Sequence, residues 1–289
     1  MKTYLECYPC FLRQALDAAE FAHASDAEKT SVVQATLALL QTLDPQATPP
    51  EIGDEIHRLV RATIRHEEPY GELKQAATEA ALQLLPWMRS QIAHAPDPFE
   101  RAVRIAIAGN IIDFGPGASY DLERALSEVT QKPCAINDLE ALRGALANSE
   151  SVLYLADNAG EIVFDKLLVE ALPRDRVTLV VRGVPVLNDV THEDAVVAGL
   201  HEVAEVIDNG ADAPGTILEE TSPAFRQRFR EADLIIAKGQ GNFETLSEVE
   251  APIYYLLTVK CPAVGAAIGA PVGAMVVKPA SELNRSTSV

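Results

Sequence analysis

The second half of the chain alternates short apolar runs with stretches of helical periodicity, and this alternation limits the fold more than any other feature. Helix candidates such as EIVFDKLLVEAL, THEDAVVAGL and SPAFRQRFREA separate the apolar runs, which are SVLYLA, VTLVVR, EVAEVID, ADLIIAK, IYYLLTVK and AMVVK. Continuous apolar runs separated by helices are typical of strands buried on both faces of a mostly parallel sheet. The sequence therefore predicts an α/β domain over residues 106–280.

Residues 1–105 have a different rhythm. The segments FLRQALDAAEFA, EKTSVVQATLALLQTL and GELKQAATEAALQLLPWM place apolar residues at helical spacing, and prolines separate them. This pattern predicts an all-helical N-terminal region over residues 1–105. The last stretch, residues 281–289, reads as a polar tail.

The chain is strongly acidic, with 24 Lys and Arg against 42 Asp and Glu and a formal net charge of −18. Such a charge disfavours nucleic acid and anionic membrane surfaces as partners, so an anionic ligand must meet local positive charge. The sequence has neither a long apolar run nor the apolar core of a signal peptide at its start, MKTYLECYPC. We therefore expect a cytoplasmic protein without a membrane partner, and composition leaves its oligomeric state open.

Acids, amides and basic side chains follow the predicted strands at the points where the strands end. Since the carboxyl ends of parallel strands meet at one edge of a sheet, these side chains are expected to line one crevice. In chain order they are Asp157 and Asn158, Arg182 and Asp189, Lys238, Asn242 and Glu244, and Lys260.

The types of these residues indicate a chemistry. Asp157, Asn158 and Asp189 offer oxygen donors without sulfur or imidazole, a set that suits magnesium or manganese. Lys238 and Lys260 supply positive charge that could hold a phosphate. A metal, two lysines and a helix N-terminus together favour phosphoryl transfer or hydrolysis of a phosphate ester.

Each residue also has a simpler structural interpretation. Asp157 or Asn158 could only cap a helix, with Glu161 as a second capping acid, and Lys260 could be a surface lysine. Glu161 could equally orient a water molecule in the site or face solvent. A dinucleotide site is disfavoured, because Glu244 stands where GQGNFE would need a third glycine.

Cys7 and Cys10 form a CxxC pair, which is half of a structural zinc site. Cys261 follows Lys260 directly and could supply a third thiol. Packed thiols, a metal or redox clip, and an accessory catalytic role all remain open. A metal or redox clip would correspond to an alternative function, in which the protein is a non-catalytic metal- or redox-binding protein that uses these cysteines.

Five blocks of the sequence resemble the metal-dependent damage-control phosphatases, a family first catalogued as domain of unknown function eighty-nine and also called acidic-residue-methyltransferase-like. The blocks are AGNIIDFG, DNAGEIVFD, VRGVPVLNDVT, ADLIIAKGQGNFETL and LLTVKC, in this order. CYPC and the helical first third resemble the compact prokaryotic branch of that family. The resemblance covers nearly the whole chain.

The resemblance implies a Rossmann-like three-layer α/β/α domain behind a helical N-terminal region. It also implies hydrolysis of phosphate monoesters of small phosphometabolites, sugar phosphates among them, with one manganese, cobalt, nickel or magnesium ion. Residues that match the family's motifs are the metal ligands Asp157, Asn158 and Asp189, the substrate-binding residues Lys238, Asn242 and Lys260, and the block of Gly109, Asn110 and Asp113.

Three features of this chain limit what the resemblance implies. Larger eukaryotic members have aspartate where this chain has Gln240, so no role of that aspartate is transferred. Glu161 and Arg182 join the phosphate-binding candidates with their individual roles open. An aspartyl-phosphate route would need a second aspartate two residues after Asp157, where Ala159 stands, so direct attack by water is favoured.

Overall fold

A computed structural model of the protein describes residues 1–110 and 122–283. The expected site residue Asp113 lies outside the described residues, as does most of the predicted tail over 281–289. Among the described residues, no helix combines the length and the apolar character needed to cross a membrane.

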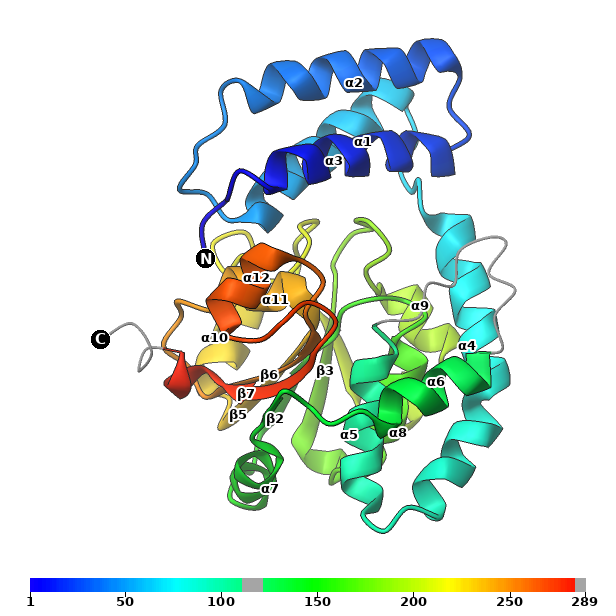
Figure 1. The fold of residues 1–289 in the computed structure, drawn as a ribbon, viewed down its shortest axis with the longest axis vertical. Helices are drawn as coiled ribbons and strands as arrows, with labels where there is room; N and C mark the ends of the chain where they lie inside the picture. Colours follow the sequence, from blue (N-terminus) through cyan, green and yellow to red (C-terminus); the bar gives the residue numbers. More distant parts are fainter. Residues whose placement is uncertain (111–121, 284–289) are drawn as a thin grey trace.

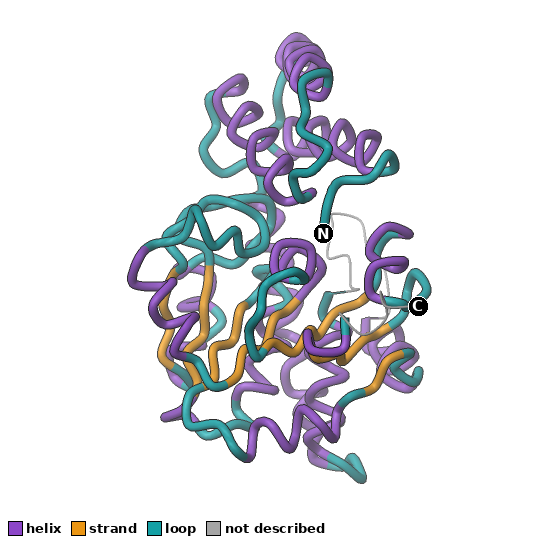
Figure 2. Tube along the Cα trace, turned by 90° about the vertical axis from the view of Figure 1, so that its left-hand side faces the viewer, coloured by secondary structure: helices purple, strands orange, loops and turns teal. Residues whose placement is uncertain are grey.

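A seven-stranded sheet forms the centre of the fold (Figure 2). Its strands are β1 (Ile136–Asn137), β2 (Val152–Leu155), β3 (Val177–Val181), β4 (Glu205–Asp208), β5 (Leu234–Lys238), β6 (Ile253–Thr258) and β7 (Met275–Pro279). They lie in the order β1-β7-β6-β5-β2-β3-β4, with β2 to β6 parallel and β7 antiparallel to β6. The predicted mostly parallel sheet is confirmed. The two-residue β1 is too short to give an apolar run in the sequence.

Helices cover both faces of the sheet, which confirms the three-layer α/β/α architecture. The helices α4 (Gly71–Ala93), α5 (Pro98–Ala108), α7 (Leu139–Ala147), α8 (Ile162–Val169) and α9 (His192–Val197) share one core with the sheet. The helices α10 (Pro223–Glu231), α11 (Gly239–Leu246) and α12 (Pro262–Ile268) share the core on the opposite face. The helix α6 (Leu122–Gln131) packs beside α5.

Strand β2 shows why the apolar runs in the sequence are continuous. Val152 and Tyr154 pack in the first core, whereas Leu153 and Leu155 pack in the second. Successive side chains of a strand point to opposite faces, so a strand covered by helices on both sides needs apolar residues at every position.

Three helices, α1 (Cys7–Phe21), α2 (Asp26–Leu40) and α3 (Pro49–Ile64), form a separate layer with its own core (Figure 1). Capping boxes at Ser25 and Thr48 fix the starts of α2 and α3. Arg58 and Arg61 of α3 both bind Asp212, in the loop after β4. The helices of the predicted region 1–105 are thus present, but α4 and α5 pack on the sheet. The domain boundary at residue 105 stays a prediction.

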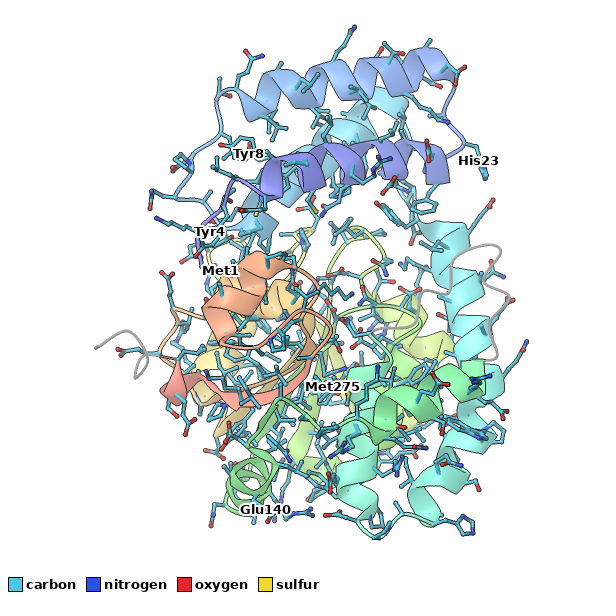
Figure 3. The ribbon with its side chains drawn as sticks, viewed as in Figure 1. Met1, Tyr4, Tyr8, His23, Glu140 and Met275 are labelled. Atoms are coloured by element: carbon cyan, nitrogen blue, oxygen red, sulfur yellow. The ribbon has the colours of Figure 1, made fainter. Side chains whose placement is uncertain are left out.

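The N-terminus also ties this helical layer to the α/β part of the molecule. The Met1 ammonium donates hydrogen bonds to the carbonyl of Glu244, at 2.7 Å, and to the hydroxyl of Ser247, at 3.0 Å (Figure 3). The start of the chain, which leads into α1, is therefore held against the end of α11.

The sheet order places a topological switch between β2 and β5. From β2 the chain continues to β3 on one side, and from β5 it continues to β6 on the other. Helices α8 and α11, which follow these two strands, lie on opposite faces of the sheet. Ligands of open α/β sheets bind at such a point, outside the carboxyl ends of the strands.

The turn between β2 and α8 packs tightly against α4. A Cβ atom added at Gly160 would lie 2.8 Å from the Cβ of Ala77 and 3.0 Å from its carbonyl carbon. Gly160→Ala is therefore expected to destabilise the fold by about 1–3 kcal/mol, because the helix must shift to make room. Chemical denaturation of the purified variant measures this change.

Gly144→Ala is the matched control, since an added Cβ there meets no atom within 4 Å. This substitution lies inside α7 and should stabilise the protein by roughly 0.5–1 kcal/mol, through helix propensity. Equal effects of the two substitutions would show that α4 does not restrict the turn.

Candidate functional site

Two loops that follow neighbouring strands pair through their backbones and bring the expected metal ligands together. The N–H of Val190 donates to the carbonyl of Asp157, and the N–H of Ala159 donates to the carbonyl of Asn188, both at 2.9 Å. Asn158 and Asp189 thus form an antiparallel bridge. This pairing places the three predicted ligands side by side at the carboxyl ends of β2 and β3.

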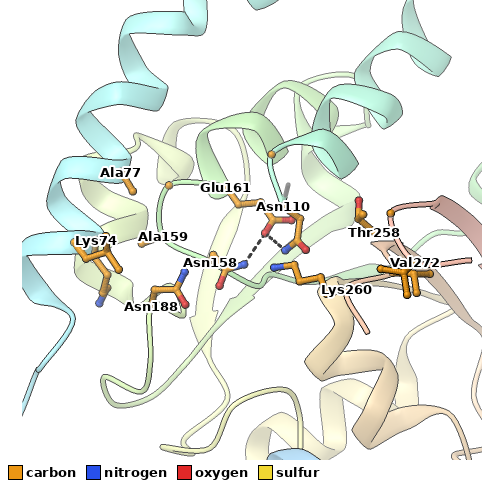
Figure 4. A pocket seen from close by; sticks show the side chains of 15 residues that line it. Lys74, Ala77, Asn110, Asn158, Ala159, Glu161, Asn188, Thr258, Lys260 and Val272 are labelled. Carbon is orange, nitrogen blue, oxygen red and sulfur yellow. Dashed lines mark hydrogen bonds between the residues drawn. The ribbon is translucent and has the colours of Figure 1, made fainter. Parts of the chain in front are cut away.

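Two cavities meet at these loops. The first cavity, of about 470 Å³, is lined by Lys74, Asn110, Glu161 and Thr258 among others (Figure 4). The second cavity, of about 340 Å³, lies between the helical layer and the α/β part; Asp157, Asp189, Gln240 and Glu244 line it on the α/β side. Both cavities share three lining residues, Asn158, Asn188 and Lys260.

The junction of the cavities is rich in buried acid. Burial raises the pKa of Asp157 to about 7, and the nearby charges of Glu161 and Asp189 act in the same direction. Burial also raises the pKa of Asp189, although its ion pair with Arg182, at 2.7 Å, acts against this. Carboxylates crowded in this way favour either protons or a bound cation.

The donor set fits a divalent ion. Two aspartates and an asparagine provide hard oxygen ligands of the kind that magnesium and manganese accept. The buried amide oxygen of Asn110 also has no hydrogen-bond partner among the described residues. One oxygen of Asp165 is also unpaired, whereas Arg182 has one unpaired nitrogen, so unpaired acceptors outnumber unpaired donors among these described residues.

Glycine at position 239 is required by the site itself. Its φ of +75° is a left-handed conformation, and an added Cβ would lie 1.9 Å from an oxygen of Asp157. The start of α11 therefore approaches the Asp157 carboxylate more closely than any residue with a side chain would allow.

Lys238 has a different place from the one expected for a phosphate-binding residue. Its side chain is 0 % exposed and lines neither cavity. Its ammonium donates to Glu161 at 2.6 Å, to the carbonyl of Ala106 at 2.9 Å, and to Asp165 at 2.5 Å. All three N–H groups are used, so direct phosphate contact by Lys238 would require breaking this arrangement.

Lys260 is the opposite case. It follows β6, is exposed, and lines both cavities at their junction. Within the described part of the chain its ammonium has no ion pair, and its charge acts on Asp157 by lowering the pKa of that carboxyl. Its backbone N–H is held by the side chain of Gln240 at 3.2 Å.

Two other expected phosphate-binding residues serve the structure around the site. The amide of Asn242 donates to the carbonyls of Lys238, at 2.8 Å, and Ala156, at 3.3 Å, and its oxygen accepts a bond from Thr216. Arg182 is 1 % exposed and supports Asp189. Neither side chain lines one of the two cavities.

All three cysteines of the expected thiol clip, Cys7, Cys10 and Cys261, line the second cavity. Burial raises the pKa of the Cys7 and Cys10 thiols. Among the described residues, however, no group of three side chains that includes a cysteine is close enough to share one metal ion.

The cluster that does meet this spacing lies elsewhere and consists of Asp54, Asp212 and Glu220. Arg58 contacts all three of these carboxylates, and Arg61 also contacts Asp212. The cluster could hold a cation, but two arginines already offset most of the charge of its three carboxylates. It joins α3 to the loop after β4.

Sequence reasoning missed several residues that shape the site. Asp165 binds Lys238 and accepts a hydrogen bond from the Tyr154 hydroxyl at 2.8 Å. It follows Glu161 by four residues, a spacing that would have placed both carboxylates on one helix face. Lys74 of α4, which binds Asp194 at 2.8 Å, gives no such signal in the sequence.

Comparisons with known proteins show the family to which the chain belongs. Residues 3–276 match the family described as the damage-control phosphatase ARMT1-like domain. A damage-control phosphatase of Pyrococcus horikoshii is 34% identical over 282 residues, which are 96% of this chain and 97% of that protein. A damage-control phosphatase of Archaeoglobus fulgidus is 40% identical over 235 residues, or 78% and 81% of the two chains.

An uncharacterized protein of Methanocaldococcus jannaschii is 38% identical over 281 residues, covering 93% of this chain and 92% of its own length. The crystal structure of a DUF89 family protein from Pyrococcus horikoshii matches this fold with a TM-score of 0.90 and 33% identity, over 96% and 99% of the two chains. Membership of the CxxC branch stays a prediction. The chain itself belongs to the damage-control phosphatase ARMT1-like family.

Proposed function

We propose that this protein is a divalent-metal-dependent phosphatase that hydrolyses phosphate monoesters of small phosphometabolites, such as sugar phosphates. The observation that carries this proposal is the junction of the two cavities, where Asp157, Asn158 and Asp189 converge beside the exposed Lys260. Two archaeal relatives that bear the name damage-control phosphatase support the same reaction.

In this proposal Asp157, Asn158 and Asp189 hold one ion of manganese, cobalt, nickel or magnesium. When bound, such an ion supplies Lewis-acid polarisation of the phosphate and lowers the pKa of a water molecule. Arg182 keeps one oxygen of Asp189 in place through its 2.7 Å ion pair. Lys260 neutralises charge that develops on the phosphoryl oxygens during transfer.

The rest of the substrate has room on either side of the junction. The second cavity offers polar side chains from both layers, namely Glu6, Gln14, Gln240 and Glu244. Such groups can bind the hydroxyls of a sugar or polyol by hydrogen bonds. The helical layer would thus form one wall of the substrate site.

The rival function, a non-catalytic thiol-based metal or redox protein, has less support. Its three cysteines do line one cavity, but they do not form a three-ligand set in the described structure. Among the described residues the acids of the junction do not meet that three-ligand spacing either. Their carboxylates are buried and crowded, which favours a bound cation, and for this reason we place the metal on the oxygen donors.

Substitution of the aspartates separates these two functions. Asp157→Asn and Asp189→Asn should each lower phosphatase turnover by roughly 100-fold or more, because a carboxylate that holds the metal is lost and with it the cation that polarises the phosphate. A panel of phosphate esters with added manganese or cobalt measures this. Full activity in both aspartate variants would remove them from the site, whereas a wild type that is inert on every ester, together with loss of bound metal in Cys7→Ser/Cys10→Ser protein, would favour the rival function.

Lys260 can be tested as the phosphate contact. Lys260→Met is expected to lower kcat by about 10²–10³-fold, as for other groups that stabilise charge in the transition state. Steady-state kinetics with one phosphomonoester measures the change. Lys132→Met, at an exposed lysine that lines neither cavity, is the control and should leave the kinetics unchanged. A kcat of Lys260→Met equal to that of the control would remove Lys260 from the site.

Metal binding should depend on pH in a defined direction. The folded protein raises the pKa of Asp157 from its ordinary value near 4 to about 7. Without metal, the stability gained from this protonated carboxyl is complete below about pH 4 and is lost as pH rises through about 7.

A divalent ion replaces the proton, so its stabilising effect should be larger at about pH 8 than at about pH 5.5. Thermal unfolding with and without manganese at the two pH values measures this difference. Asp157→Asn should reduce the difference. An equal metal-induced shift of Tm at both pH values would contradict the assignment of the ion to these carboxylates.

A further inference from the structure

Glu161 has no free oxygen in the described structure. Its Oε1 accepts a hydrogen bond from Lys238 at 2.6 Å. Its Oε2 accepts hydrogen bonds from the side-chain nitrogens of Asn158, at 2.9 Å, and Asn110, at 2.5 Å (Figure 4). The carboxylate is only 2 % exposed, although it lies at the wall of the first cavity. It therefore has little capacity left to orient a water molecule.

The same bonds determine which way the Asn158 side chain faces. Its Nδ2 donates to Glu161 and also to Asp157, each at 2.9 Å, so both of its N–H groups are used. The carbonyl oxygen of the amide must then face the other way, as Figure 4 shows. If the amide were flipped, its oxygen would face the carboxylates of Asp157 and Glu161, and both would lose the hydrogen bond from Nδ2.

Glu161 itself is fixed by a chain of buried groups. Lys238 binds both Glu161 and Asp165, and Asp165 accepts a hydrogen bond from Tyr154. Lys238, Asp165 and Tyr154 are each 0 % exposed. Since β2, β5 and α8 carry these residues, the position of Glu161 follows from the packing of the sheet and not from the ligand.

We infer that Glu161 is a positioning residue, which orients the amide of Asn158 so that its oxygen faces the metal, and that Lys238 holds Glu161 for this purpose. This inference rests on the proposed function for the presence of a metal. It gives Glu161 and Lys238 a role that differs from substrate contact. Asn110, the second donor to Glu161 and a donor to Asp157 at 2.7 Å, completes the arrangement.

Glu161→Gln tests the inference. Lys238 needs an acceptor, so the introduced glutamine must keep its oxygen toward Lys238 and turn its NH₂ group toward Asn158. Two NH₂ groups would then face each other, so the contact that holds the Asn158 nitrogen away from the metal becomes repulsive, and only the bond to Asp157 still favours this orientation. The dissociation constant for manganese or cobalt, measured by calorimetry, should rise about 10–100-fold, as for other residues that orient a metal ligand.

The double variant Glu161→Gln/Asn158→Asp should recover most of the lost affinity. An aspartate in place of Asn158 accepts a bond from the introduced glutamine with either oxygen and offers the other to the metal. Asp157 loses its bond from position 158 but keeps the donor Asn110 at 2.7 Å. The double variant also conserves the net charge. If Glu161→Gln alone is recovered unfolded, the double variant compared with the wild type decides the question.

Glu100→Gln is the control for loss of charge. Glu100 is a half-buried acid of α5 that forms an ion pair with Arg104 at 2.6 Å and lines neither cavity. The metal affinity of this variant should stay close to that of the wild type. Unchanged affinity in Glu161→Gln, with a fall in kcat alone, would overturn the inference and make Glu161 a catalytic residue.

Failure to recover affinity in the double variant would also overturn it. These outcomes are distinct from failure of the proposed function, in which the wild type binds metal but hydrolyses no phosphate ester. A wild-type protein without affinity for divalent ions would remove the metal ligands and this inference together.

Discussion

A buried lysine among carboxylates underlies the whole site. Lys238 lies at the end of β5 and contacts the carbonyl of Ala106 in α5. It also contacts Glu161, at the turn after β2, and Asp165, in the helix that follows this turn. Burial acts against its charge, but Asp165 and Glu161 more than offset this, so its pKa lies above the usual range. Loss of one partner from such a group leaves an uncompensated buried charge, so the lysine, the acids and the three elements depend on one another.

The same cluster would favour a cation at the proposed site. Four buried carboxylates gather at the ends of β2 and β3, and two buried cations, Lys238 and Arg182, accompany them. The carboxylates are those of Asp157, Glu161, Asp165 and Asp189. The pKa of Asp157 and that of Asp165 each rise to about 7, chiefly through burial. Buried carboxylates that the protein itself does not neutralise lower the stability of the folded state. A cation bound at this point would offset that loss of stability.

The sequence predicted the strands and the convergence of Asp157, Asn158 and Asp189, because apolar periodicity and the geometry of parallel sheets depend on short stretches of chain. It did not predict the direction of Lys238. Successive strand residues alternate between faces, and Lys238 shares the face of Ile236, which packs under α5 and α8. This alternation alone did not show on which face of the sheet a ligand would bind. The second cavity was also beyond prediction, since it depends on how α1 and α3 dock on the α/β part through contacts between residues far apart in the chain.

These constraints also bear on how an acidic protein selects an anion. With a net charge of −18, long-range attraction cannot bring a phosphate to the site, so recognition must occur at short range. Two lysines line the cavities in the described structure, and Lys74 is already balanced by Glu68 and Asp194. Lys260 therefore carries the local positive charge, at the junction that a metal on the two aspartates and Asn158 would share. In the proposed function an anion would bind strongly only when both charges act on it, so metal loading would be a condition for substrate binding.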